Sequence, residues 1–172
     1  MGKTFIFGDI HGCSHELSEL LTKSNPDPAR DTLVFLGDFV DRGPGSKGVI
    51  DQVLHLATTF GRIITLKGNH EEMFLDYLQG INTSLYLRIG GAQTLKSYGC
   101  EIFARPEEQV IPPEHLNFLL NLLPYWEDAE NIYVHAGLES GVHLSQQSPY
   151  WLYWSDGKQF LKSGHDFGKR VI

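Results

Sequence analysis

Three times in its first seventy residues, the chain runs from a short apolar stretch into a glycine followed by acidic or histidine side chains. The apolar stretches TFIF, TLVFL and IITLK lead into GDIHG (Gly8–Gly12), GDFVDRG (Gly37–Gly43) and GNHEE (Gly68–Glu72). Short apolar runs that are bounded by glycine are typical of buried strands. The pattern therefore predicts three strands of one sheet, each ending in a polar turn.

The segments between these runs have the period of helices. We expect strands at Thr4–Phe7, Thr32–Leu36 and Arg62–Leu66, with helices at Cys13–Lys23 and Ser46–Thr59 between them. This alternation predicts a largely parallel sheet with helices on its faces. Ligands bind such sheets beyond the carboxyl ends of the strands, and all three polar turns fall there.

The rest of the chain is also expected to contain both helices and strands. Helices are expected at Glu71–Leu78, at Ala92–Ser97 and from Pro112 to Leu123, and a fourth strand is expected in NIYVHAG, Asn131–Gly137. The aromatic segment Pro149–Trp154 is expected to form core or the wall of a cleft. Residues Gly168–Ile172 predict a turn and the start of another buried strand, so we expect the chain to end inside a structural element.

Composition narrows the class of protein. With 172 residues and 41% hydrophobic content, the chain can bury one core, which predicts a single domain over residues 1–172. A formal net charge of −7 argues against a nucleic-acid partner, because such partners need a broad cationic surface. No apolar stretch approaches the roughly 20 residues of a membrane span, and the two cysteines, Cys13 and Cys100, are expected to stay reduced. We therefore expect a cytoplasmic protein with no membrane partner.

The polar residues at the strand ends have the chemistry of metal ligands. Any one of these motifs alone would be an ordinary turn or cap, but four of them at strand ends favour a shared site. Their mixture of carboxylate, amide and imidazole groups suits a pair of transition-metal ions better than a calcium site. The residues concerned are Asp9, His11, Asp38, Asp41, Asn69, His70 and His135.

In this order, GDIHG, GDFVDRG, GNHE and HAG (His135–Gly137) resemble the signature of the calcineurin-like metallophosphoesterases, in particular their phosphoprotein phosphatase branch. The segment YLRIGGAQTLKSYG, Tyr86–Gly99, is similar to bacterial and phage members. The resemblance covers essentially the whole chain. It implies a four-layer αββα sandwich with mixed β-sheets, formed here by a catalytic domain whose C-terminal strands we expect to be missing.

The resemblance also assigns roles to individual residues. It implies two divalent metal ions, for which we expect Mn²⁺, with Fe or Zn as alternatives. One ion would be held by Asp9, His11 and Asp38, and Asp38 would bridge to a second ion held by Asn69 and His135. His70 would be the general acid, oriented by Asp41, and Arg42 and Asn69 would bind the substrate phosphate.

These implied roles agree with physical chemistry. Bridged metal ions make hydroxide from a shared water near neutral pH and flank an in-line displacement. A carboxylate beside an imidazole raises its pKa, so Asp41 would help His70 to donate a proton. The planar guanidinium of Arg42 matches two phosphoryl oxygens.

Two parts of the family pattern are not found in this sequence. The family supplies a second histidine to the metal held by Asn69 and His135, and that histidine would lie beyond Ile172. His165 is a possible but disfavoured substitute, because it precedes the expected strand. The family's second phosphate-binding arginine is absent from Trp151–Phe160, where Lys158 is a weak replacement.

The function predicted from the sequence is a metal-dependent phosphoesterase that hydrolyses phosphate monoesters. The main interpretation is a protein serine/threonine phosphatase that works by direct attack of dimetal-bound hydroxide, with a phosphorylated protein or small phosphoester as substrate. The alternatives are a diadenosine-tetraphosphate hydrolase and a truncated, weakly active binding remnant. A cleft with room for adenine over Tyr150–Trp154 would favour the nucleotide, and a shallow, open site would favour a phosphorylated side chain.

Overall fold

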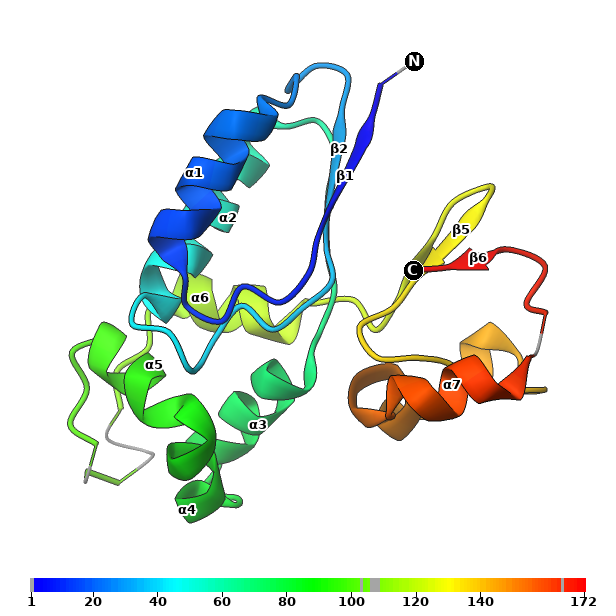
Figure 1. Ribbon diagram of the computed structural model, residues 1–172. Coiled ribbons are helices and arrows are strands. Elements are labelled where there is room, and N and C mark those ends of the chain that lie inside the picture. Colours follow the sequence, from blue (N-terminus) through cyan, green and yellow to red (C-terminus); the bar gives the residue numbers. More distant parts are fainter. Residues whose placement is uncertain (1, 103, 106–108, 165) are drawn as a thin grey trace.

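The computed structural model of the protein describes residues 2–102, 104–105, 109–164 and 166–172 (Figure 1). The first half of the chain forms a parallel sheet of β1 (Thr4–Phe7), β2 (Thr32–Phe35) and β3 (Ile63–Thr65), in that spatial order. Thr4 lies opposite Thr32, and Leu33 lies opposite Ile63. The parallel sheet predicted from the three apolar runs is confirmed.

Helices cover one face of this sheet. Two of them, α1 (Ser14–Ser24) and α2 (Ser46–Thr59), connect consecutive strands of the sheet. The third, α6 (Pro113–Leu120), lies near the lower ends of α1 and α2 (Figure 1). Side chains alternate between the two faces of a strand. Leu33 and Phe35 consequently pack among the helices in the main core, whereas Val34 points to the opposite face.

A second, mixed sheet lies against that opposite face. It consists of β4 (Trp126–Glu127), β5 (Asn131–Tyr133) and β6 (Arg170–Val171), in which β4 and β5 are antiparallel and β5 and β6 are parallel. Tyr133 packs with Val34 and Leu66 between the two sheets. Ile132 and Val134 point the other way and pack with Leu138 and Leu152.

The outer layer beyond the second sheet is helical. It contains the short turn η3 (Leu144–Gln146), the wide helical turn η4 (Tyr150–Trp154) and the helix α7 (Gly157–Ser163). Phe160 of α7 packs against the core formed by Ile132 and Val134. The layer order is thus helix, sheet, sheet, helix, which is the αββα arrangement expected from the resemblance.

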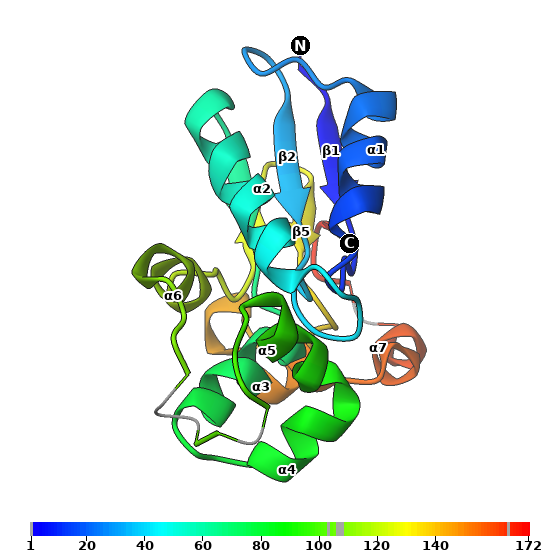
Figure 2. The ribbon, with the colours of Figure 1, turned by 90° about the vertical axis from the view of Figure 1, so that its left-hand side faces the viewer.

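The remaining helical segments lie at the carboxyl ends of the first sheet. These segments are α3 (Asn69–Leu78), α4 (Thr83–Tyr86), η1 (Leu87–Gly91) and α5 (Ala92–Ser97). Figure 2 shows α3, α4 and α5 gathered below the ends of β1 and β2. They surround the edge of the sheet at which the polar turns were predicted to meet.

Several predicted boundaries were wrong. The helix expected from Glu71 already begins at Asn69. The helix expected to reach Leu123 ends at Leu120, because Leu123 forms a parallel bridge with Leu66. The strand expected over Asn131–Gly137 ends at Tyr133.

None of the described helices combines the length and the apolar character needed to cross a membrane.

Candidate active site

The polar turns at the carboxyl ends of the strands adopt unusual backbone conformations. His11, Asp38, Asp41 and Arg42 all have positive φ angles, of 46°, 54°, 70° and 64°. Such conformations are uncommon for residues other than glycine and persist where the surrounding structure enforces them. Gly37, with φ of 109°, has no alternative, because a Cβ atom there would lie 2.5 Å from the backbone nitrogen of Gly68. The turns are therefore packed tightly against one another.

The five residues predicted to bind metal meet around Asp38, whose side chain is only 3% exposed. The Nε2 atom of His11 lies 3.3 Å from one carboxylate oxygen of Asp38 and 3.8 Å from Oδ2 of Asp9. On the other side, Nε2 of His135 lies 3.5 Å from the second oxygen of Asp38 and 3.2 Å from Oδ1 of Asn69. Asp38 thus stands between two histidines that come from different sheets.

Backbone carbonyls set the orientation of both imidazole rings. The Nδ1 atoms of His11 and His135 lie 2.9 Å from the Val40 carbonyl and 3.0 Å from the Leu36 carbonyl. When each Nδ1–H donates to its carbonyl, each Nε2 presents a lone pair toward Asp38. Nε2 of His11 is buried and has no hydrogen-bond partner among the described residues. A buried lone pair beside carboxylates fits a bound cation.

The donor atoms fall into two groups that share Asp38. His11, Asp38 and His70 form one group, and Asp9, Asp38 and His135 form the other, with the donor atoms of each group within 4.8 Å of one another. The sharing of Asp38 fits two divalent cations bridged by one carboxylate. The membership differs from the predicted sets in that Asp9 groups with His135 and His70 groups with His11.

His70 lies between the carboxylate of Asp41 and the guanidinium of Arg42. Its Nδ1 atom is 2.7 Å from Oδ2 of Asp41, and its Nε2 atom is 2.9 Å from Nη2 of Arg42. Burial by itself lowers the pKa of His70, but the hydrogen bond to Asp41 and the negative charges of Asp38 and Asp41 outweigh it, so that the pKa is raised. The pairing of His70 with Asp41 that the sequence predicted is present.

Glu71 holds two of the turns together, a role that the sequence analysis missed. Its buried carboxylate accepts N–H groups from Asp38, Phe39 and Val40 in one turn and from Gly68 in the next, at 2.7–3.2 Å. Burial raises the pKa of Glu71 to about 7, and the negative charge of Asp38 acts in the same direction. The only feature of the sequence that could have indicated this role is the position of Glu71 directly after Asn69 and His70 in GNHEE.

Asp41 has partners that were also missed. Tyr86 and Thr94 donate hydrogen bonds to Oδ1 of Asp41 at 2.8 and 2.7 Å. Both residues come from the segment Tyr86–Gly99, whose resemblance to bacterial and phage phosphatases was the signal that could have found them. No local pattern places them beside Asp41, because the contact spans 45 residues or more.

A polar pocket of about 360 Å³ opens over this cluster. The pocket is lined by metal-binding candidates and also by Tyr153, Trp154, Ser155 and Gly157. Trp154 is 43% exposed, and its indole N–H donates to Glu72 at 2.5 Å. The aromatic segment is therefore partly the wall of a cleft, as expected. Lys158 is not among the residues that line the pocket, and His165 lies outside the described residues.

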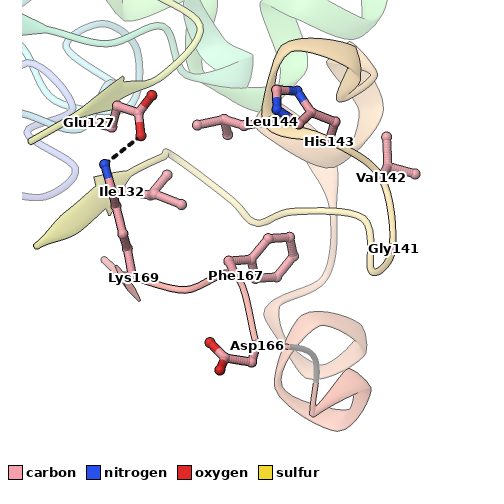
Figure 3. A pocket seen from close by; sticks show the side chains of 9 residues that line it. All are labelled: Glu127, Ile132, Gly141, Val142, His143, Leu144, Asp166, Phe167 and Lys169. Atoms are coloured by element: carbon pink, nitrogen blue, oxygen red, sulfur yellow. Dashed lines mark hydrogen bonds and ion pairs between the residues drawn. The ribbon is translucent and has the colours of Figure 1, made fainter. Parts of the chain in front are cut away.

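A larger pocket of about 460 Å³ lies apart from these motifs, between the loop at Gly141–Leu144 and the segment at Asp166–Lys169 (Figure 3). Its charged groups are already engaged with protein atoms. Lys169 pairs with Glu127 at 2.7 Å and donates to the Asp128 carbonyl, and Asp166 accepts the N–H of Gly168. The described residues that line it do not bring together unengaged polar groups as those of the smaller pocket do.

Comparison with known proteins yields a consistent set of relatives. Residues 2–169 match the calcineurin-like phosphoesterase family. A symmetrical bis(5'-nucleosyl)-tetraphosphatase of Methylobacillus flagellatus is 32% identical over 98% of this chain and 57% of its own length. Serine/threonine-protein phosphatase 1 of Salmonella typhimurium is 38% identical over 51% of this chain and 38% of its own length.

Comparison with solved structures supports the same family. A crystal structure assigned as a diadenosine tetraphosphatase superposes with a TM-score of 0.65 at 26% identity, covering 86% of this chain and 55% of the other. The chain thus spans less than two thirds of the length of these relatives. With a family match over nearly all its residues and a four-layer fold, the chain belongs to the calcineurin-like phosphoesterases.

Proposed function

We propose that residues 1–172 act as one catalytic domain that hydrolyses dinucleoside polyphosphates of the diadenosine tetraphosphate class. The substrate is inferred from the relative that matches 98% of the chain, which is named as a symmetrical bis(5'-nucleosyl)-tetraphosphatase. Symmetrical cleavage of diadenosine tetraphosphate by one water gives two molecules of ADP. The single observation that carries the phosphoesterase chemistry is the position of Asp38 between His11 and His135, with Nε2 of His11 left without a partner among the described residues.

Two divalent metal ions are part of the proposal, with Mn²⁺ as the first choice. The chain would hold them with the five residues around Asp38, namely Asp9, His11, Asp38, Asn69 and His135. When bound, such ions polarise phosphoryl oxygens and lower the pKa of a coordinated water. The carbonyls of Val40 and Leu36 orient the two histidine rings so that both Nε2 atoms lie beside Asp38, where they would be available as ligands.

The remaining polar residues would act on the substrate. Asn69 and Arg42 would bind phosphoryl oxygens, and His70 would donate a proton from Nε2 to the leaving oxygen. The N–H of Arg42 can donate to Nε2 of His70 only while that nitrogen lacks a proton. We therefore infer that Arg42 turns from His70 to the substrate when His70 acts as the acid.

The pocket wall supports a nucleotide substrate. Tyr153 and Trp154 line the same pocket as Asp9 and His135, and aromatic rings stack on nucleobases regardless of sequence. An adenine over these rings would leave its phosphates near the metal-binding cluster. The comparisons also favour this substrate over a phosphoprotein, because the relative named as a tetraphosphatase matches far more of the chain than the protein phosphatase does.

A substrate panel tests the proposal. The protein, stripped of metal and then reloaded with Mn²⁺, would be given diadenosine tetraphosphate, p-nitrophenyl phosphate and a phosphoserine peptide. We expect the highest kcat/KM on diadenosine tetraphosphate, with ADP as the sole nucleotide product and no turnover in excess chelator. Preference for the phosphopeptide would instead support the second candidate, a protein serine/threonine phosphatase similar to the Salmonella relative.

A further inference from the structure

We propose that Tyr86 and Thr94 are positioning residues that act through Asp41 on the general acid His70. The inference rests on the proposed function, in which His70 protonates the leaving group. It also gives a role to the segment Tyr86–Gly99, which is similar to bacterial and phage phosphatases. In the structure this segment is a clamp, formed by Tyr86, Gly90, Gly91 and Thr94, around the turn that carries Asp41 and Arg42.

The clamp uses one oxygen of Asp41 and leaves the other to His70. Asp41 is fully buried, and its Oδ1 atom accepts hydrogen bonds from Tyr86 at 2.8 Å and from Thr94 at 2.7 Å. Its Oδ2 atom lies 2.7 Å from Nδ1 of His70. Two donors on one oxygen prevent the carboxylate from rotating, so the other oxygen stays directed at the imidazole. With Nδ1 engaged, the other ring nitrogen, Nε2, lies beside Arg42, which lines the pocket.

Thr94 uses its whole hydrogen-bonding capacity at this position. Its hydroxyl donates to Asp41 and accepts the backbone N–H of Asp41 at 2.8 Å. Because a hydroxyl has one proton, the 2.9 Å contact between Thr94 and Ser46 must have Ser46 as the donor. Thr94 therefore fixes both the side chain and the backbone of Asp41.

The two glycines of the clamp are required by its geometry. The backbone N–H of Arg42 donates to the Gly90 carbonyl at 3.2 Å, and a Cβ atom on Gly90, whose φ is 125°, would lie 2.6 Å from that nitrogen. A Cβ atom on Gly91 would lie 2.3 Å from the ring of Tyr86. Gly90 thus lets the clamp approach the turn, and Gly91 makes room for the tyrosine that reaches Asp41.

The turn needs such support. Asp41 and Arg42 both occupy the left-handed region, which is unfavourable for residues other than glycine. The backbone N–H groups of both residues donate hydrogen bonds to the clamp, to the Thr94 hydroxyl and to the Gly90 carbonyl. The two hydroxyl donors also satisfy a buried carboxylate, so an experiment has to separate a purely structural role from an effect on His70.

The test compares two shape-conserving variants with two controls. Tyr86→Phe and Thr94→Val each remove one donor to Asp41, and Thr94→Ser restores the hydroxyl. Tyr77→Phe is the matched control, because the Tyr77 ring is equally buried and lies 4.9 Å from the Tyr86 ring, and its hydroxyl contacts Gln109 rather than Asp41.

The expected result depends on the leaving group. Tyr86→Phe and Thr94→Val should each lower kcat on alkyl phosphates by roughly 10- to 100-fold, the range typical of losing a residue that orients a functional group. The loss on p-nitrophenyl phosphate should be several-fold smaller, with KM and metal content unchanged. Thr94→Ser and Tyr77→Phe should stay within about threefold of wild type. Equal losses on both substrate types, or no loss, would overturn the proposal.

A double-mutant cycle tests whether the clamp acts through His70. In the His70→Asn background, Tyr86→Phe should cause no further loss of activity, because the acid that it orients is gone. A further loss of full size would contradict the proposal. These assays use simple aryl and alkyl phosphates, so they remain decisive if diadenosine tetraphosphate proves to be the wrong substrate.

An NMR measurement keeps the proposal testable without activity. The imidazole Nδ1–H of His70 should give a downfield proton signal, assigned by its absence from His70→Asn. That signal should be lost or broadened by exchange in Tyr86→Phe and Thr94→Val and should persist in Tyr77→Phe. An unchanged signal in both clamp variants would overturn the proposal.

Discussion

The backbone N–H of Asp38 donates to the carboxylate of Glu71 at 2.8 Å, and Glu71 has no exposed surface. Through this bond and three others from Phe39, Val40 and Gly68, a single side chain connects the turn that bears Asp38 to the first turn of α3. Asp38 is the residue shared by both groups of metal-binding candidates. The geometry of the cluster therefore depends on a residue that does not belong to it.

We predict that Glu71→Gln lowers the free energy of unfolding of the metal-free protein by about 2–4 kcal/mol. The amide group of glutamine would point its own N–H atoms at backbone N–H donors, leaving these buried groups unpaired. Urea denaturation would measure the change. Glu19→Gln, on the exposed face of α1, is the control and should change stability by less than about 0.5 kcal/mol. Similar effects of the two substitutions would show that the Glu71 hydrogen bonds contribute nothing.

We predict that Asp38→Asn weakens metal binding at both positions, because its two oxygens face different histidines. The loss of affinity should be at least about 10- to 100-fold. Metal analysis after dialysis would measure the content per chain. Asp9→Asn is the comparison, since Asp9 belongs to only one group, and it should lose no more than one ion. Two retained ions in Asp38→Asn would exclude the bridging role.

For His70→Asn we predict intact metal content and a turnover on alkyl phosphates lower by roughly 10²–10⁴-fold. Substrates with good leaving groups, such as p-nitrophenyl phosphate, should lose much less, because their leaving oxygen needs little protonation. Steady-state kinetics on both substrate types, together with metal analysis, would decide the matter. Loss of a metal ion would mean that His70 is a ligand, in line with its grouping with His11 and Asp38.

A fourth prediction concerns acid stability away from the site. Although partial burial opposes it, hydrogen bonds from Glu130, Tyr133 and Asn131 lower the pKa of Asp128 to about 2. An unfolded aspartate titrates near 3.9, so the ionised Asp128 stabilises the fold above about pH 4, and this contribution is lost as the pH falls toward 2. The stability difference between wild type and Asp128→Asn should therefore shrink between pH 5 and 2. A difference that stays constant in urea titrations over this range would contradict the prediction.

The sequence predicted well those elements whose pattern is local. β1 and α2 have the predicted bounds, because continuous apolar runs and helical periodicity specify them without reference to the rest of the chain. The short segments α4, α7 and β4 were missed. β4 has only two residues and exists because it pairs with β5, and α7 has few apolar residues and gains its place by packing Phe160 against the second sheet.

The site likewise has features that follow from local sequence patterns and features that depend on distant contacts. The meeting of Asp9, Asp38 and Asn69 follows from the rule that parallel strands end at one edge of a sheet, which a sequence can reveal. The hydrogen bonds of Glu71 and Tyr86 could not be predicted in this way. Both depend on the exact approach of helices to turns far away in sequence, and each is made by a residue type that is common in cores and helices.

The division of the cluster between two sheets has a consequence for how the protein is made. Asp9, His11, Asp38 and Asn69 lie within the first seventy residues, whereas His135 is supplied by the second sheet and is fixed by the Leu36 carbonyl. During synthesis, a growing chain would expose four of the five candidate ligands well before the fifth emerges from the ribosome. An ion shared by Asp38 and His135 would then fasten one layer of the sandwich to the other, so its capture would mark the moment at which the two sheets have docked.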